Sequence, residues 1–168
     1  MRILWAPWRM EYISKWSSGR GRQGCIFCTV VASERDEDGL VIARSKYSIA
    51  MLNAFPYNTA HVMVAPKRHM ARLELLEEPE VVDIFKLVKA VIRAIDEEYK
   101  PEGYNIGLNI GRVAGAGIES HLHIHIVPRW SGDTNFMPVI TGTKVIPEDL
   151  KVTFKRLKKR LVTEDLTL

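Results

Sequence analysis

Three histidines alternate with apolar residues in the segment HLHIHIV, where they occupy positions 121, 123 and 125. Successive side chains of a β-strand point to opposite faces of the sheet, so a strand here would place all three imidazoles on one face. Because a strand rises about 3.3 Å per residue, His121 and His125 would lie ~13 Å apart, too far to bind one metal ion together. We therefore expect the three rings to have different roles.

The middle ring, His123, has the chemistry of a nucleophile. A neutral imidazole nitrogen attacks well near pH 7 when the other ring nitrogen keeps its proton and donates it to an acceptor such as a carbonyl. Attack on a nucleotide phosphate would form a phosphorus–nitrogen bond and break a phosphoanhydride bond, while backbone N–H groups and a neighbouring histidine stabilise charge on the oxygens. The alternative is a half-buried strand that happens to carry histidine, but three alternate positions among 5 histidines in 168 residues disfavour it.

A glycine-rich segment, NIGRVAGAGIES, directly precedes the histidines and runs from Asn109 to Ser120. Gly111, Gly115 and Gly117 permit tight turns and a close approach of the backbone to a ligand. Consecutive exposed N–H groups in such a loop form an anion-binding nest. Most glycine-rich loops are only hairpin connections. This one lies beside the histidine strand, so one hairpin could supply both a phosphate cradle and the nucleophile.

A pair of cysteines, Cys25 and Cys28, frames the sequence Cys-Ile-Phe-Cys near the N-terminus. Such a pair supplies half of a tetrahedral zinc site, and two histidines from elsewhere in the chain could complete a Cys2His2 set. A redox-active pair and two buried cysteines are the alternatives that the spacing leaves open. A disulfide is not needed for stability, because a chain of this length buries a sizeable core.

The residues around these motifs predict an α+β fold with about five strands in a mostly antiparallel sheet. Short runs rich in β-branched and apolar residues predict strands at residues 40–44, 48–52, 61–65, 104–110 and 121–127. Runs of strands with segregated helices are typical of this fold class. We expect one long helix and one C-terminal helix to accompany the sheet.

The long helix is predicted at residues 80–99, where apolar residues recur at alternating four- and three-residue steps. Pro79 can occupy its first turn, and Pro101 with Gly103 ends it. Its apolar stripe consists of Val81, Phe85, Val88, Ile92, Ile95 and Tyr99. The C-terminal helix is predicted after Pro147, with Leu150, Phe154, Leu157 and Leu161 on one face.

The composition predicts one domain over residues 1–168, with 46% hydrophobic and 26% charged residues. No apolar window reaches the length of a membrane span, and the first residues, MRILWAPWRM, lack the apolar region of a secretory signal. We therefore expect a cytoplasmic protein without membrane contact. The aromatic residues of the N-terminal segment should pack on the body or on a partner subunit, and residues 17–24 predict a flexible connector. These aromatic residues are Trp5, Trp8, Tyr12 and Trp16.

The net charge of +4 includes a basic cluster at residues 155–160 near the C-terminus. The cluster consists of Lys155, Arg156, Lys158, Lys159 and Arg160. Such a run is more typical of the solvated face of a terminal helix than of a nucleic-acid site. We therefore do not expect nucleic acid as a partner.

At these residues the chain resembles the histidine triad (HIT) superfamily of nucleotide hydrolases and transferases. The signature His-φ-His-φ-His-φ-φ, with φ apolar, matches residues 121–127, and the similarity extends through LWAPWRMEYI, CIFC, LNAFPYNTAHVMVAPKRH and GDTNFMPVITGTKVIP. The chain looks most like bacterial diadenosine tetraphosphate phosphorylases and the fragile-histidine-triad branch. The resemblance implies a homodimer that cleaves dinucleoside polyphosphates such as diadenosine tetraphosphate, by phosphorolysis or hydrolysis.

The resemblance also implies roles for single residues. His123 would become nucleotidylated, His125 would bind a phosphate oxygen, and His61 would orient the catalytic strand. Gly117 stands where many hydrolase members have Gln or Ser, which leaves water and inorganic phosphate open as the acceptor. The matching nucleotide-binding positions are Asn53 for the ribose hydroxyls, and Asn109, Ala116 and Gly117 for the phosphate chain.

Zinc-bearing HIT proteins resemble this chain around its cysteines. The resemblance implies a structural zinc ion bound by Cys25, Cys28, His69 and His121. A closed site with four protein ligands would tether the N-terminal segment to the catalytic strand and fix the direction of His121. The metal would then not be the catalyst.

Two other functions remain open on the sequence. In the first, a metallohydrolase, His121 and His123 share a catalytic zinc ion that keeps an open position for water. In the second, a non-enzymatic zinc module binds nucleic acid through the cluster at residues 155–160, with an affinity that falls steeply with salt.

Overall fold

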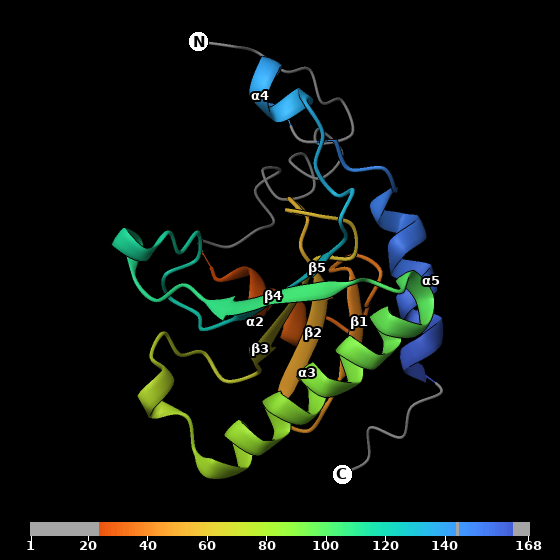
Figure 1. Cartoon of the computed structure of the whole chain (residues 1–168). Coiled ribbons are helices and arrows are strands. Elements are labelled where there is room, and N and C mark those ends of the chain that lie inside the picture. The colour runs from red at the N-terminus through yellow and green to blue at the C-terminus, as the bar shows by residue number, and fades with distance from the viewer. Residues whose placement is uncertain (1–23, 144, 163–168) are drawn as a thin grey trace.

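Five strands form one antiparallel sheet at the centre of the molecule (Figure 1). The computed structural model describes residues 24–143 and 145–162. The strands are β1 (Val41–Arg44), β2 (Ser48–Leu52), β3 (Val62–Pro66), β4 (Gly103–Leu108) and β5 (Ile124–Arg129), in the order β1-β2-β3-β5-β4. Every neighbouring pair is antiparallel, so the predicted α+β fold and its sheet are confirmed.

Two helices cover one face of this sheet, as the sequence predicted. The long helix α3 (Glu78–Tyr99) begins with a capping box between Glu77 and Glu80 and has a proline in its first turn, which fixes its start. The C-terminal helix α5 (Leu150–Val162) lies beside α3 and against β1 (Figure 1). Buried residues of both helices share one core with the side chains of the strands, so this face is the main hydrophobic layer.

The apolar stripe of α3 is only partly the one that the sequence predicted. Val88 and Ile95 are buried as expected, but Val81 is 37% exposed and Phe85 is 53% exposed. The other residues that α3 buries in the core are Ile84, Leu87, Ala90, Val91 and Ala94. The helix has more apolar surface than the sheet can cover, so its first turns keep an exposed apolar side.

The opposite face of the sheet is covered by the short helix α2 (Ile26–Ala32). Phe27 and Val30 of α2 pack with alternate residues of β1, β2 and β3 in a second, smaller core. Because successive strand residues point to opposite faces, the two cores share the strands without sharing side chains. Helix α2 thereby brings the cysteine pair against the sheet.

The histidine strand starts later than the sequence predicted. β5 begins at Ile124, so His125 lies in the strand while His121 and His123 precede it. The strand starts late because β3, its neighbour, pairs with it only as far as the Val64–Ile124 pair. Before that pair, the N–H of Leu122 donates to the Met70 carbonyl at 2.6 Å instead. The remaining predicted strands agree with the observed strands to within one or two residues at each end.

Three short helical segments complete the described chain. They are η1 (Leu73–Leu75), η2 (Arg112–Ala114) and α4 (Met137–Thr141). Within residues 24–143 and 145–162, no helix is long and apolar enough to cross a bilayer. The predicted aromatic segment with Trp5, Trp8, Tyr12 and Trp16, and the predicted connector apart from its last residue, lie outside the described residues.

Candidate functional site

His123 is held by a hydrogen bond to the backbone just before it. Its Nδ1 donates to the carbonyl oxygen of His121 at 2.8 Å, so the ring proton is on Nδ1 and the lone pair is on Nε2. Nε2 has no hydrogen-bond partner among the described residues, and it is not one of their fully buried unpaired atoms. Burial lowers the pKa of His123, which favours the neutral ring. This arrangement is the one that a nucleophilic imidazole requires.

Two residues outside the histidine motif, Tyr57 and His61, determine which ring nitrogen of His125 carries the proton. The backbone N–H of Tyr57 donates to His61 Nδ1 at 3.1 Å, so the proton of a neutral His61 must be on Nε2. That Nε2 lies 3.0 Å from His125 Nδ1 and donates to it. The proton of a neutral His125 is therefore on Nε2, which is the nitrogen that remains for a ligand.

Both rings of this pair stay neutral near pH 7. Burial, followed by the nearby His125 and His123, lowers the pKa of His61 to about 3. Burial and the nearby His123 lower the pKa of His125 to about 4. His125 thus offers an uncharged N–H donor beside His123, and the two ring centres lie 4.8 Å apart.

A second cluster joins both cysteines to two histidines. Cys25, Cys28, His69 and His121 each offer one ligand atom, and these four atoms lie within 4.8 Å of one another. Cys25 Sγ is 3.1 Å from His121 Nδ1, and Cys28 Sγ is 3.2 Å from His69 Nδ1. A tetrahedral zinc ion with Zn–S and Zn–N bonds of about 2.3 and 2.0 Å needs ligand atoms roughly 3.3–3.8 Å apart. The donor set fits such an ion, and the Cys28 Sγ–His121 Nδ1 separation of 3.7 Å falls within this range. The two shorter separations lie about 0.1–0.2 Å below it, so small shifts of the side chains would complete the tetrahedron.

The tautomer of His121 also suits a metal ligand. Its Nε2 donates to the carbonyl oxygen of Pro66 at 2.8 Å, which leaves the Nδ1 lone pair directed toward the cysteine sulfurs. A hydrogen bond from the second ring nitrogen to a carbonyl is the usual way in which proteins orient a metal-binding histidine. The four residues that the resemblance named as ligands thus come together from segments far apart in the sequence.

The cluster of two cysteines and two histidines shares contacts with His123. His121 contributes its side chain to the cluster and its carbonyl oxygen to His123 Nδ1. Phe27, which lies between the two cysteines in the sequence, places its ring 4.9 Å from the His121 ring and 5.1 Å from the His123 ring. A change in the position of α2 therefore reaches His123 through both Phe27 and His121.

Two of the predicted nucleotide-binding residues, Asn53 and Asn109, lie next to segments that carry the histidines, and the other two lie in the glycine-rich loop. Asn53 directly follows β2, and its N–H donates to the His61 carbonyl at 2.9 Å. Asn109 directly follows β4, whose last residue pairs with Ile124 next to His123. In the loop, the N–H of Ala116 donates to the Gly111 carbonyl at 3.3 Å, whereas the N–H of Gly117 has no partner in the described part of the chain.

With this geometry in place, the comparisons with known proteins identify the family. A family model for the HIT domain matches residues 34–132, more than half of the chain. The chain belongs to the HIT domain family. The AP-4-A phosphorylase of Mycobacterium tuberculosis is 40% identical to this HIT protein over 161 residues, which cover 94% of this chain and 83% of that one.

Two further HIT proteins extend this likeness. An adenosine 5'-monophosphoramidase of Schizosaccharomyces pombe is 31% identical over 137 residues, which cover 82% of this chain and 98% of that one. A crystal structure of a hypothetical histidine triad nucleotide-binding protein from Sulfolobus tokodaii matches with a TM-score of 0.67 and 28% identity, and it covers 82% of this chain and 92% of that one. The resemblance to the histidine triad superfamily is therefore confirmed.

Three contributors to the HIT site were missed by sequence reasoning. They are the Tyr57 N–H, the Pro66 carbonyl and the Phe27 ring. Backbone groups leave no trace in the residue type, so the first two had no signal in the sequence. Phe27 did have one, because an aromatic residue inside a Cys-x-x-Cys segment would lie close to any metal that the two cysteines held.

Proposed function

We propose that the protein transfers a nucleotidyl group from a dinucleoside polyphosphate, such as diadenosine tetraphosphate, to His123 and then to phosphate or water. The observation that carries this proposal is the hydrogen bond from His123 Nδ1 to the His121 carbonyl, because it leaves the Nε2 lone pair for attack. Two relatives support it, since they are named an AP-4-A phosphorylase and an adenosine 5'-monophosphoramidase. Both names describe enzymes that act on adenosine nucleotides.

In the first step, His123 Nε2 attacks the α-phosphorus of the bound substrate. A phosphorus–nitrogen bond forms, the bond to the bridging oxygen breaks, and ATP leaves with both electrons of that bond. The His121 carbonyl stabilises the positive charge that the ring gains, because its oxygen accepts the hydrogen bond from Nδ1–H. The neutral Nε2–H of His125 donates to a phosphoryl oxygen as negative charge builds there.

In the second step, an oxygen of the acceptor attacks the same phosphorus and the phosphorus–nitrogen bond breaks. The electron pair of that bond returns to His123 Nε2, and the proton lost by the acceptor passes to solvent. Inorganic phosphate as the acceptor yields ADP, and water yields AMP. Asn53 would hold the ribose hydroxyls, while Asn109 and the backbone at Ala116 and Gly117 would hold the phosphate chain. The positions of Asn53 beside His61 and of Asn109 at the end of β4 support the roles of these two residues.

We further propose that Cys25, Cys28, His69 and His121 hold a structural zinc ion. Zinc would supply a rigid link between α2 and the segment before β5. The tautomer of His121 and the spacing of the four ligand atoms support the proposal. Thiolate ligands also suit the reducing cytoplasm in which we expect the protein.

The geometry favours this role over a catalytic zinc ion shared by His121 and His123. The free nitrogen of His121 is directed toward the cysteine sulfurs, and the Nδ1 of His123 is occupied by the His121 carbonyl. The two lone pairs therefore do not belong to one cluster, and His123 is not part of the group that could hold a metal in the described chain.

Nucleic acid is also disfavoured as a partner, because much of the basic cluster on α5 is already paired. Arg156 binds Glu98 and Glu148, and Arg160 binds Glu98. These contacts join α5 to the C-terminal end of α3, so the cations contribute to the arrangement of the helices. Phosphate groups would have to displace carboxylates to bind here.

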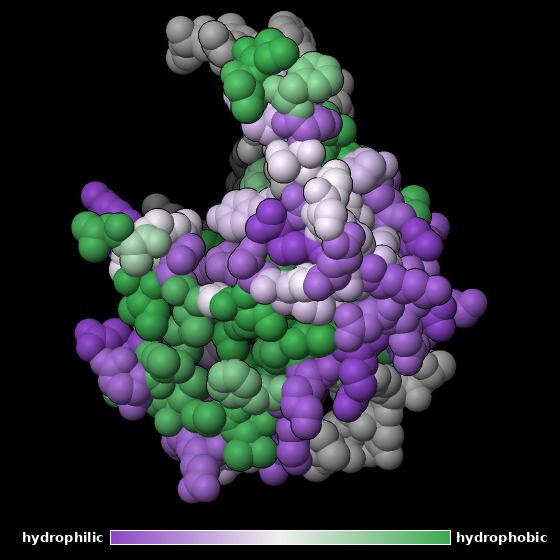
Figure 2. Space-filling model, viewed as in Figure 1, coloured by the Kyte–Doolittle hydropathy of each residue, from purple (hydrophilic) through white to green (hydrophobic). Residues whose placement is uncertain are grey.

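We also infer a homodimer that uses the β4 edge of the sheet and the adjoining side of α3. Strand order leaves β4 at an edge, and Ile106 of β4 is 47% exposed. Ile106 lies on the same face as α3, because Tyr104, two residues earlier, donates its hydroxyl hydrogen to Asp96 Oδ1 of α3 at 2.6 Å. Figure 2 shows apolar side chains gathered on this side of the molecule. An exposed patch of this kind next to an open strand edge is typical of a protein–protein interface.

Incubation with diadenosine tetraphosphate, with and without inorganic phosphate, tests the proposed reaction. We expect mass spectrometry to find AMP attached to the peptide that contains His123. ADP and ATP that appear only with phosphate would show phosphorolysis, and AMP and ATP without it would show hydrolysis. The absence of both turnover and adduct with any nucleotide would refute the proposal.

Two matched substitutions separate the nucleophile from the metal site. His123→Asn should lower kcat by a factor of about 10³ or more, as losses of catalytic nucleophiles do, and should keep one zinc ion per chain. His69→Asn should lose zinc, because it removes a ligand. Loss of zinc from His123→Asn would favour the catalytic-zinc alternative instead.

A further inference from the structure

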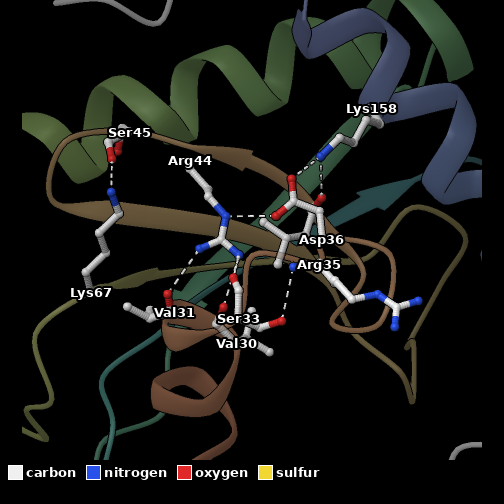
Figure 3. Close-up of polar contacts among 10 residues, drawn as sticks. Val30, Val31, Ser33, Arg35, Asp36, Arg44, Ser45, Lys67 and Lys158 are labelled. Atoms are coloured by element: carbon white, nitrogen blue, oxygen red, sulfur yellow. Dashed lines mark hydrogen bonds and ion pairs between the residues drawn. The ribbon is translucent and has the colours of Figure 1, made fainter.

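Helix α2 is held at its C-terminal end by one arginine from β1 (Figure 3). Nη2 of Arg44 donates to the carbonyl oxygens of Val30 and Ser33, both at 3.0 Å, and Nη1 donates to that of Val31 at 3.5 Å. The last carbonyls of a helix have no partner within it, and a cation there also meets the negative end of the helix dipole. The Val30 carbonyl also accepts the Ser33 N–H at 3.2 Å. Arg44 therefore adds a second donor at Val30 and supplies donors to the carbonyls of Val31 and Ser33 at the end of α2.

The same guanidinium group reaches the C-terminal helix through Asp36. Arg44 Nε donates to Asp36 Oδ1 at 2.8 Å, and Lys158 of α5 binds the other carboxylate oxygen. Burial alone would raise the pKa of Asp36, but hydrogen bonds from Lys158 and Arg44 lower it, so the carboxylate stays charged. Since Asp36 binds the guanidinium from the side, it fixes the plane in which Arg44 reaches the α2 carbonyls.

Helix α2 depends on such outside contacts for its position. It has 7 residues, far fewer than the number at which an isolated helix becomes stable, about 12–15. Its other contacts are the burial of Phe27 and Val30 and a close approach to Gly39, where an added Cβ would lie 2.7 Å from Val30 Cγ2. Arg44 is the contact that fixes the end of the helix opposite to Cys25.

The position of α2 in turn sets the metal cluster. Cys28 lies on the helix, Cys25 caps its N-terminus, and Phe27 between them lies against the His121 and His123 rings. A shift or rotation of α2 therefore moves two of the four ligand atoms at once. Tetrahedral zinc sites depend on ligand geometry, and residues that only orient ligands commonly change metal affinity by about 10–100-fold.

We propose that Arg44 is a positioning residue of the metal site, and that it acts by fixing α2 so that both cysteine sulfurs face His69 and His121. This inference rests on the zinc site proposed above. Arg44 itself is far along the chain from every ligand and does not bind the metal. Its planar group is required because one nitrogen of lysine cannot bind three carbonyls and a carboxylate together.

The zinc affinity of folded variants tests the inference. We expect Arg44→Ala to weaken zinc binding by about tenfold or more in competition with a chromogenic chelator, and Arg44→Lys to recover only part of the loss. Arg35→Ala is the matched control, because Arg35 lies in the connection between α2 and β1. Among the described residues its side chain forms an ion pair only with Asp38, on the surface. This variant should therefore bind zinc as the wild type does. Circular dichroism of each zinc-free variant shows whether it is folded at the temperature of the titration.

If Arg44→Ala does not fold without zinc, Asp36→Asn replaces it in the experiment. This substitution keeps the arginine that binds the α2 carbonyls, but it weakens the bond that holds the guanidinium group in its plane. It should weaken zinc binding in the same direction and by less. A folded Arg44→Ala or Asp36→Asn protein with the zinc affinity of the wild type would overturn the inference, as would an equal loss in Arg35→Ala. A wild-type protein that binds no zinc would refute the zinc site itself.

Discussion

The Tyr57 N–H determines the proton positions of two histidines in series. It occupies His61 Nδ1, so His61 donates through Nε2 to His125, and His125 is left with its proton on the nitrogen that faces a ligand. The proposed phosphate donor thus owes its direction to a backbone group rather than to a carboxylate. A neutral donor of this kind is ready at pH 7 without taking a proton from solvent.

The buried histidine pair makes the protein sensitive to acid. The pKa of His61 is lowered to about 3 and that of His125 to about 4, whereas both take up protons near the ordinary value of 6.5 in the unfolded chain. Below pH 6.5 the unfolded state binds more protons than the folded state does. We therefore expect the free energy of unfolding to fall as the pH drops from about 6.5 toward 4, and these two histidines to make no further difference to it above pH 6.5. Urea denaturation at a series of pH values measures this.

The matched variant for this measurement is His61→Asn. It removes one of the two depressed groups but keeps the metal ligands, so the metal site contributes equally to both proteins. The variant should lose stability less steeply than the wild type between pH 6.5 and 4, the interval set by the ordinary and lowered pKa values. Equal slopes in the two proteins would show that His61 is not held neutral by the fold.

At the scale of elements, α2 is a separate layer, and the proposed zinc site would tie it to the sheet. Cys25 and Cys28 meet His69, which follows β3, and His121, which precedes β5. The larger core between the sheet, α3 and α5 includes no residue of α2. The two layers should therefore respond differently when the metal is removed.

Removal of zinc with a chelator should loosen α2 and leave α3 intact. We expect faster amide hydrogen exchange in Ile26–Ala32 and unchanged exchange in Glu78–Tyr99, measured by mass spectrometry. Formation of the AMP adduct should slow, because Phe27 and the His121 carbonyl lose their fixed positions beside His123. An α2 that stays equally protected after complete removal of zinc would contradict this account.

For the whole molecule, the apolar surface left by α3 and β4 is the feature that points to assembly. Phe85 and Val81 lie one turn apart on α3, and both are exposed together with Ile106 of the edge strand. Two basic residues of α5, Arg156 and Arg160, form ion pairs with Glu98 of α3. That residues 1–168 form one domain stays a prediction.

Phe85→Glu should convert the proposed dimer to monomers, since it places a charge in the apolar interface. Sedimentation velocity at micromolar concentration measures the change. Val113→Glu is the control, because Val113 is 104% exposed in the glycine-rich loop and lies off the proposed interface, so that variant should stay dimeric. A wild-type monomer, or a Phe85→Glu dimer, would remove the proposal.

The sequence by itself determined the elements and the chemical groups of the site. The alternation around His123, the spacing of Cys25 and Cys28, and the periodicity of the long helix are local patterns. They predicted a strand and a helix in the right places, although β5 begins only at Ile124 and α3 buries a partly different stripe. The order of residues also carried the family resemblance, which the HIT domain match confirmed. For these features, no knowledge of distant contacts was needed.

The tertiary structure decided which groups meet. Cys25 is 96 residues from His121 and His61 is 64 from His125, and such pairs form only when strand register and the two layers bring them together. The start of β5 at Ile124 depends on where β3 ends, and the exposure of Phe85 depends on how much of α3 the sheet can cover. Local periodicity contains neither the partner of a strand nor the width of the surface beneath a helix.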